Sequence, residues 1–151
     1  NKKKNYRISR FWLKDQKARN YKMKKILIVL SRYNKTEKNL LPLTLKVLKK
    51  KRVKWSLKKV NGAFEIPVMI ARNVKKFDGF ISLGIIIKGE TPNFEFISQA
   101  ITNGLINLSI ENKKPIGNGI ITCLRINQIV KRKHKGEEAA EAVLDVLNPK
   151  N

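Results

Sequence analysis

Two kinds of pattern alternate along the chain. Short runs of mostly apolar, branched residues, typical of buried strands, occupy residues 25–31, 54–60, 78–87 and 115–123. The segments that follow them predict helices that begin near Pro42, Pro67 and Thr91, and two more near residues 125–133 and 137–147. Strands that alternate with helices indicate an α/β fold, with a parallel sheet and helices on both faces.

The regular pattern covers residues 25–148, which we expect to form one domain. A chain of 151 residues that is 42% hydrophobic can build one core but not two domains. Residues 1–24 are basic and lack clear periodicity. We expect this head to be either a disordered or loosely docked arm, or sequence upstream of a start at Met23.

The composition excludes several classes of protein. No apolar run reaches the roughly 18 residues that span a bilayer, and no signal-peptide pattern follows the basic head. The single cysteine, Cys123, excludes an internal disulfide, and with one histidine, His134, it argues against a zinc site. We therefore expect a cytoplasmic protein with no membrane partner. Cys123 is most simply a small buried residue at a strand end.

The net charge of +23 has two explanations. Clustered lysines and arginines can bind nucleic acid through its phosphates. Alternatively, an AT-rich genome encodes Lys, Asn and Ile together, and lysine here outnumbers the arginine that base-reading proteins prefer. Composition alone favours the second explanation over a nucleic-acid partner.

Residues that could bind or react with a ligand follow the carboxyl ends of the predicted strands. Ligands of parallel sheets bind beyond those ends. After the third strand, Gly89 permits close backbone approach, while Thr91 and Pro92 suit the start of a helix. Free N–H groups at such a helix start can bind a phosphate. The segment is therefore either a phosphate site or a plain capped turn.

Aromatic residues follow the first and second strands. Phe64 is either a core residue or a platform for a flat ring, and Glu65 is either a helix-start carboxylate or a ligand acceptor. Tyr33 ends the first strand at the same predicted edge. Together with the phosphate segment, these residues suggest a ligand that carries a flat polar ring and a phosphate.

Four motifs together resemble the lumazine synthase family, over about residues 25–147. They are "SRYN" (31–34), "NGAFEIP" (61–67), "FDGFISLGIIIKGETPNFEF" (77–96) and "HKGEEAAEAVL" (134–144). The resemblance implies a flavodoxin-like three-layer α/β/α sandwich with a four-stranded parallel sheet. It also implies the penultimate step of riboflavin biosynthesis, in which 5-amino-6-(D-ribitylamino)uracil condenses with 3,4-dihydroxy-2-butanone 4-phosphate, with release of phosphate and water.

The resemblance further implies how the protein works with partners. No metal or organic cofactor takes part. The chain is expected to form homo-oligomers (pentamers, decamers or shells of sixty subunits) whose active sites lie between subunits. Riboflavin synthase is either a physical partner or only the next enzyme.

The resemblance assigns roles to particular positions. Tyr33 would stack on the pyrimidine, and the other substrate-binding positions are Ala63, Phe64, Glu65, Ile85, Ile86, Ile87 and Asn118. The phosphate-binding positions are Gly89, Glu90, Thr91 and Arg132, the arginine arriving from a neighbouring subunit. Lys135 matches a catalytic lysine, and Asn93 occupies the place of the family's proton-transferring histidine.

Asn93 is the main departure from the family pattern, because asparagine cannot shuttle a proton near pH 7. An acid–base group contributes roughly 10²–10⁴ in rate, but holding two reactive substrates together supplies much of the barrier reduction. We therefore expect a slow but real synthase. The alternatives are a catalytically degenerate paralogue that serves as a shell or scaffold, and a basic nucleic-acid-associated protein.

Two further departures are Asn118, where the family often has an apolar or aromatic residue contributed across the subunit interface, and a shortened loop between Arg132 and His134. We expect His134 to be a solvated loop histidine rather than a substitute base.

Overall fold

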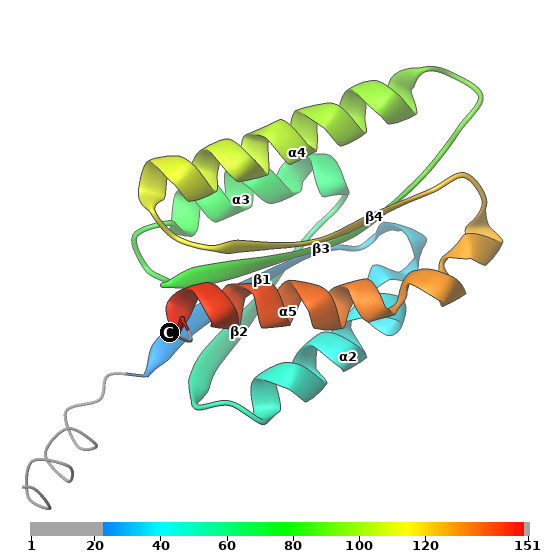
Figure 1. Cartoon of the computed structure of the whole chain (residues 1–151). Helices are drawn as coiled ribbons and strands as arrows, with labels where there is room; N and C mark the ends of the chain where they lie inside the picture. Colours follow the sequence, from blue (N-terminus) through cyan, green and yellow to red (C-terminus); the bar gives the residue numbers. More distant parts are fainter. Residues whose placement is uncertain (1–22, 150–151) are drawn as a thin grey trace, which may run out of the picture.

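Four parallel strands form one sheet in the computed structural model, which describes residues 23–149 (Figure 1). The strands, in the spatial order β2-β1-β3-β4, are β1 (Lys24–Ser31), β2 (Val53–Val60), β3 (Gly79–Ile87) and β4 (Ile116–Cys123). Every neighbouring pair is parallel, so all four carboxyl ends lie at one edge of the sheet. Of the predicted basic head, residues 1–24, the first 22 lie outside the described residues. Strand β1 begins at Lys24, one residue earlier than expected.

Helices cover both faces of this sheet and confirm the predicted three-layer sandwich. On one face lie α2 (Thr36–Lys49) and α5 (His134–Leu147); on the other lie α3 (Ile66–Asn73) and α4 (Asn93–Asn112) (Figure 1). The remaining elements are short 3₁₀ turns: η1 (Tyr33–Lys35), η2 (Ala63–Glu65), η3 (Ile126–Gln128) and η4 (Val130–Arg132).

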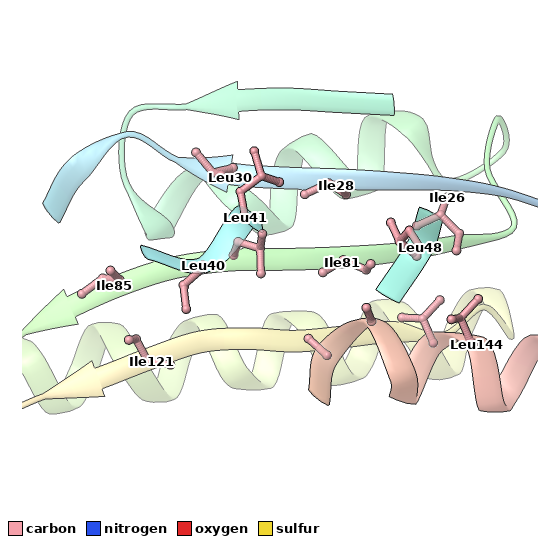
Figure 2. Close-up of a cluster of buried hydrophobic side chains, with 14 of the residues drawn as sticks. Ile26, Ile28, Leu30, Leu40, Leu41, Leu48, Ile81, Ile85, Ile121 and Leu144 are labelled. Atoms are coloured by element: carbon pink, nitrogen blue, oxygen red, sulfur yellow. The ribbon is translucent and has the colours of Figure 1, made fainter. Parts of the chain in front are cut away.

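Each face of the sheet buries its own apolar core. Ile26, Ile28 and Leu30 of β1 point toward α2 and α5, where Leu40, Leu48 and Leu144 meet them (Figure 2). The alternate β1 residues, Leu27 and Val29, pack under α3 with Ile66, Ile70 and Phe80. Because β1 is covered on both faces, its sequence is a continuous apolar run rather than an alternating one.

Helix α2 begins at Thr36, so the prediction that it starts near Pro42 is wrong. Pro42 lies inside the helix on its exposed side, where the missing N–H and ring clash typically cost about 3 kcal/mol. Burial of Leu40, Leu41 and Leu48 outweighs that local cost, since each fully buried leucine contributes roughly 1.5–3 kcal/mol. Tertiary packing has therefore overridden a local helix-breaking signal.

The predicted helix over residues 125–133 is also wrong, because this segment forms η3 and η4 instead. Gln128 Oε1 accepts the N–H groups of Leu124 and Arg125, at 2.7 and 3.2 Å, and holds the chain in a tight turn. Helix α5 begins at His134 rather than at residue 137. His134 therefore lies in the first turn of a helix and not in a loop.

Gly117 allows α5 to approach β4 closely. A Cβ atom at Gly117 would meet the carbonyl group of Ala139 and lie 2.9 Å from Val143 Cγ2. A Cβ atom at Gly104, inside α4, would instead make an ordinary 3.5 Å contact with Pro67.

We expect Gly117→Ala to lower the free energy of unfolding by about 1–3 kcal/mol, because overpacking forces α5 away from the sheet. Gly104→Ala is the matched control, and it should raise that free energy by up to about 1 kcal/mol through helix propensity. Urea denaturation followed by circular dichroism, at one fixed protein concentration, measures both. Equal stabilities of the two variants would contradict this account of the α5–β4 contact.

Candidate active site

Most of the sequence-predicted site residues gather at the carboxyl edge of the sheet, at the right of Figure 1. There η1 follows β1, η2 follows β2, the loop of residues 88–92 follows β3, and η3 and η4 follow β4. A backbone bond from Lys88 N–H to Cys123 O, of 2.8 Å, continues the pairing of β3 and β4 up to this edge. The parallel order of the strands thus brings four separate loops together.

The backbone around Tyr33 is held by hydrogen bonds on several sides. Tyr33 N–H donates to Asn61 O at 3.3 Å, and Thr36 Oγ1 donates to Tyr33 O at 2.7 Å. The Tyr33 side chain is 65% exposed, and a Cβ atom at Gly62 would lie 3.3 Å from its ring. A fixed backbone therefore presents an open aromatic ring beside η2.

Asn34 is a site residue that the sequence prediction did not include. Its Nδ2 donates to Ile85 O at 2.9 Å, which ties η1 to the end of β3. Asn34 and Lys35 both have left-handed backbone angles, φ 60° and 53°. Asparagine tolerates this conformation better than most residues, and an asparagine next to an aromatic at a strand end is the signal that could have identified it.

Turn η2 places Ala63, Phe64 and Glu65 at the same edge. Ala63 is buried against β3, where Gly84 leaves the space that a side chain would fill. Phe64 is 63% exposed, so it is not a core residue. Glu65 Oε2 accepts the N–H of Gly62 at 3.0 Å, which supports its own turn as a helix-start carboxylate does.

The three isoleucines that end β3 direct their side chains into the protein. Ile85 is buried in the core under α2 and α5, and Ile87 packs against the same core. Ile86 packs against the core under α3 and α4. Ile86 and Ile87 are only partly buried, and the Ile85 carbonyl is already bonded to Asn34.

The loop that follows β3 is open to solvent. Gly89, Glu90 and Thr91 are exposed, and a Cβ atom at Gly89 would have no neighbour within 4 Å. Helix α4 begins at Asn93 with Pro92 at the cap, one residue later than predicted. Thr91 Oγ1 lies 3.4 Å from Asn93 N as a long hydrogen bond, so Thr91 caps the helix only weakly.

One lysine and the start of helix α4 place positive charge at this loop, which also carries the carboxylate of Glu90. Asn93 is exposed at the first position of α4, at the positive end of the helix dipole. Lys88, which the sequence prediction did not include, holds its Nζ 3.5 Å from Glu95 Oε1 of that helix. The loop thus offers free backbone donors with a lysine beside them.

Arg132 lies near the end of β4 at the same edge. Its Nη1 donates to Gln128 O at 3.2 Å. Burial raises the pKa of the Cys123 thiol above its usual value, and the nearby positive charge of Arg132 opposes that rise. The guanidinium therefore lies near the last residue of β4.

Lys135 and His134, in the first turn of α5, both face Glu138. Lys135 Nζ is 2.9 Å from Glu138 Oε2, and His134 Nε2 is 3.7 Å from Glu138 Oε1. The hydrogen bond from Lys135 lowers the pKa of the Glu138 carboxyl, with smaller contributions from the charges of both residues. Lys135 must leave Glu138 before it can act on a substrate.

Asn118 is not brought to this edge within one chain. It pairs with Ser82 in the sheet, five residues before the end of β4, and its Oδ1 accepts the N–H of Ile120 at 3.2 Å. Five strand residues span roughly 16 Å, so Asn118 lies well back from the end of β4.

The gathered groups suit binding and orientation more than proton transfer. The edge presents two open aromatic rings, the N–H groups of a helix start and several cations. Within residues 23–149, no three His, Cys, Asp or Glu side chains meet as metal ligands. No helix in the same range is long and apolar enough to cross a bilayer.

Comparison with known proteins identifies the family. A family model described as 6,7-dimethyl-8-ribityllumazine synthase matches residues 23–151. Proteins named 6,7-dimethyl-8-ribityllumazine synthase from Buchnera aphidicola subsp. Baizongia pistaciae and Blochmanniella pennsylvanica are each 39% identical over 137 residues. Those alignments cover 83% and 82% of this chain and 86% of each relative.

The chain belongs to the 6,7-dimethyl-8-ribityllumazine synthase family. A relative of the same name from Paenarthrobacter aurescens is 38% identical over 96 residues, which cover 59% of this chain and 60% of that protein. The family resemblance predicted from the four motifs is thereby confirmed. The roles assigned to single residues remain predictions, because the lumazine synthase family match tests no residue by itself.

We expect Asn34→Ala to lower the free energy of unfolding by about 2–3 kcal/mol, because it loses a hydrogen bond and forces alanine into a left-handed conformation. Asn34→Gly loses only the hydrogen bond and should lower the free energy of unfolding by less than Asn34→Ala does. At most positions glycine is the more destabilising of the two. Asn39→Ala, which removes an amide bonded to Lys35 O from a right-handed helix position, should change stability by less than about 1 kcal/mol. Calorimetric melting measures all three variants, and equal losses for glycine and alanine would contradict the role assigned to the left-handed conformation of Asn34.

Proposed function

We propose that this chain is a 6,7-dimethyl-8-ribityllumazine synthase that accelerates its reaction mainly by holding the two substrates together. The family membership assigns the activity. The observation that carries the positioning proposal is the arrangement of open aromatic rings and a helix start at one sheet edge, with Asn93 where a proton-transferring group is expected.

The pyrimidine substrate would bind between η1 and η2. The exposed rings of Tyr33 and Phe64 offer apolar faces to a flat ring, and the ribityl chain would lie along the segment of Ala63 to Glu65. Backbone groups at the end of β3, on the side that faces η1 rather than β4, would bond the pyrimidine edge. The bond from Asn34 to the Ile85 carbonyl keeps Tyr33 and the end of β3 in one fixed relation.

The phosphate of the second substrate would bind at the start of α4. Backbone N–H groups near Thr91 and Asn93, together with the helix dipole, favour an anion there. Lys88 lies beside this loop, and Arg132, from this subunit or a neighbour, would add a bidentate donor. Glu90 would contribute through its backbone, because its carboxylate repels phosphate.

The chemistry can proceed, although more slowly, without an acid–base side chain at position 93. The substrate amine attacks the ketone carbonyl and water leaves, which gives an imine; phosphate then leaves, and closure of the second ring with loss of a second water completes the product. Two bound reactants gain a large effective concentration, which can reach about 10⁵ M or more in well-oriented cases. Lys135 is the nearest candidate for proton transfer once it leaves Glu138, while Asn93 can only donate or accept hydrogen bonds.

Assembly of several copies would complete the site. The described edge is open in a single chain, and Arg132 and Asn118 are the residues that the family resemblance places across a subunit boundary. Exposed apolar side chains outside the aromatic pair support a homo-oligomer; they include Phe96, Ile106 and Ile110 of α4, with Leu124, Ile126 and Val130 after β4.

We expect Asn93→His to raise the turnover rate by roughly 10²-fold or more, because it restores an acid–base group at the start of α4. The rate should also gain an ionisation near pH 6.5 that the unchanged chain lacks. Asn93→Gln keeps an amide and should leave the rate nearly unchanged. Absorbance assays of product formation across pH would refute the role assigned to Asn93 if histidine gave neither effect.

We expect Thr91→Ala to raise KM for the phosphate-bearing substrate by roughly 10-fold with a smaller change in kcat, because a hydrogen bond to a charged group is lost. Thr102→Ala, on the exposed side of α4, removes a hydroxyl bonded to Ser98 O and serves as the matched control. Steady-state kinetics with each substrate varied in turn separates the two constants. If both substitutions act alike, Thr91 does not bind the phosphate.

A further inference from the structure

Two buried hydroxyl groups flank the exposed ring of Tyr33. Ser31, the last residue of β1, and Thr36, the first residue of α2, are both fully buried, whereas the Tyr33 side chain between them is 65% exposed. Ser31 Oγ lies 3.2 Å from Thr36 Oγ1, and Thr36 Oγ1 lies 2.7 Å from Tyr33 O. We call Ser31 and Thr36 the hydroxyl pair.

The chemistry of the three groups fixes the direction of both hydrogen bonds. A carbonyl oxygen can only accept, so the Thr36 hydroxyl donates its proton to Tyr33 O. The Thr36 oxygen is then the acceptor of the second bond, and the Ser31 hydroxyl is its donor. Hydrogen bonds that follow one another in the same direction polarise and strengthen each other. Ser31 therefore reinforces the bond by which Thr36 holds the Tyr33 carbonyl.

Core packing alone does not explain why hydroxyl groups occupy these two positions. Ser31 directly follows the buried apolar run of β1, and a buried hydroxyl is costly unless it is hydrogen-bonded. A Cβ atom at Gly84 would lie 3.2 Å from Ser31 Oγ and 3.2 Å from Ala63 Cβ, so Ser31 lies where β1, β3 and η2 meet. The hydroxyl pair is thus at the junction of the elements that would bind the pyrimidine.

Two other hydroxyls are fully buried in the part of the chain that the structure describes, and both have structural partners. Thr44 Oγ1 donates to Leu40 O at 3.0 Å, inside α2. Ser82 Oγ donates to Gly117 O at 2.8 Å, between β3 and β4. Neither bond involves a residue of the candidate active site, in contrast to the hydroxyl pair.

The backbone at Tyr33 sets the place of the Tyr33 ring. Because most of this ring is exposed, its position depends chiefly on the backbone that carries it. Asn34 and Lys35 have left-handed backbone angles, and the chain turns so that the Thr36 hydroxyl meets the carbonyl three residues earlier. A displacement of about 1 Å in a substrate-positioning group can cost roughly 10²-fold in rate. A bond that fixes this carbonyl can therefore affect catalysis without touching a substrate.

We propose that Thr36, supported by Ser31, is a positioning residue that holds the Tyr33 ring for the pyrimidine-bearing substrate. The proposal rests on the proposed function, in which the Tyr33 ring offers its face to the pyrimidine. Neither hydroxyl of the pair contacts a substrate, since both are fully buried. Loss of the Thr36 hydroxyl should act on the pyrimidine substrate and not on the phosphate-bearing one, whose expected loop follows β3 rather than β1.

The first test removes the Thr36 hydroxyl and keeps the shape of the side chain. Thr36→Val should raise KM for the pyrimidine substrate, and Kd for the fluorescent product 6,7-dimethyl-8-ribityllumazine, by roughly 5–10-fold, which is the loss of about one hydrogen bond. KM for the phosphate-bearing substrate should change by less than about 2-fold. Thr36→Ser keeps the hydroxyl and should restore both constants to within about 2-fold of the unchanged chain. Ser31→Ala removes only the supporting bond and should raise them by about 2–3-fold.

Thr44→Val is the matched control, because it removes a fully buried hydroxyl from the same helix. It should leave Kd for the product and KM for both substrates within about 2-fold of the unchanged chain. Urea denaturation and sedimentation establish that the two valine variants fold and assemble as the unchanged chain does. A purely structural role for Thr36 would give the two valine variants the same kinetic constants.

A cycle of single and double substitutions with Tyr33→Ala separates this inference from the proposed function. Tyr33→Ala alone should weaken product binding, because the stacking ring is lost. Thr36→Val added to Tyr33→Ala should then change Kd by less than about 2-fold, since the ring that Thr36 positions is absent.

Several results would overturn the proposal. Weaker binding in Tyr33→Ala but not in Thr36→Val would refute the positioning role and leave the stacking role intact. Equal weakening in Thr36→Val and Thr44→Val, or full additivity of Thr36→Val and Tyr33→Ala, would indicate a general loss of packing. Unchanged binding in Tyr33→Ala would refute the stacking role in the proposed function, and the positioning role with it.

Discussion

Burial of β1 on both faces is the constraint on which the rest of the structure depends. Residues Ile26 to Leu30 are all at most 1% exposed, with alternate side chains directed into two different cores. A one-residue slip of β1 would exchange every one of those side chains between the cores. The register of β1 with both β2 and β3 is therefore tightly specified, and with it the level at which the strands end.

The candidate active site depends on the strands ending at the same edge of the sheet. Tyr33, Phe64 and Thr91 follow three different strands, and they share one edge only because β2, β1 and β3 are parallel and in register. The bond from Asn34 to the Ile85 carbonyl then connects the turn after β1 directly to β3. The left-handed conformation at Asn34 and Lys35 costs about 1–2 kcal/mol per residue, and the surrounding hydrogen bonds hold the turn against it. Such stored strain is common where a side chain must be held for function.

Sequence patterns predicted the strands well because each is a short run of buried branched residues, and the parallel order followed from the helices between them. The start of α2 could not be predicted, since the Pro42 signal is local and the packing of Leu40 and Leu48 that overrides it is tertiary. The sequence pattern of η3 and η4 is typical of a helix. It gives no sign that Gln128 Oε1 accepts two backbone N–H groups and holds the chain in a tight turn instead. In the site, aromatic and glycine residues at strand ends were visible in advance. The role of Asn34 was not, because it depends on a bond to Ile85, which is distant in the sequence. The +23 charge could not be interpreted from composition, because only the fold shows which lysines lie opposite acids, as Lys59 does beside Glu37.

Catalysis by positioning is the central claim for this chain, and one measurement tests it most directly. Both substrates are mixed with the unchanged, assembled protein, and product formation is followed by absorbance and fluorescence against the uncatalysed reaction in the same buffer. The account predicts turnover clearly above that background although Asn93 cannot transfer a proton. A rate no faster than background, from protein shown to be folded and assembled, would contradict it and favour a shell or scaffold that has lost the activity.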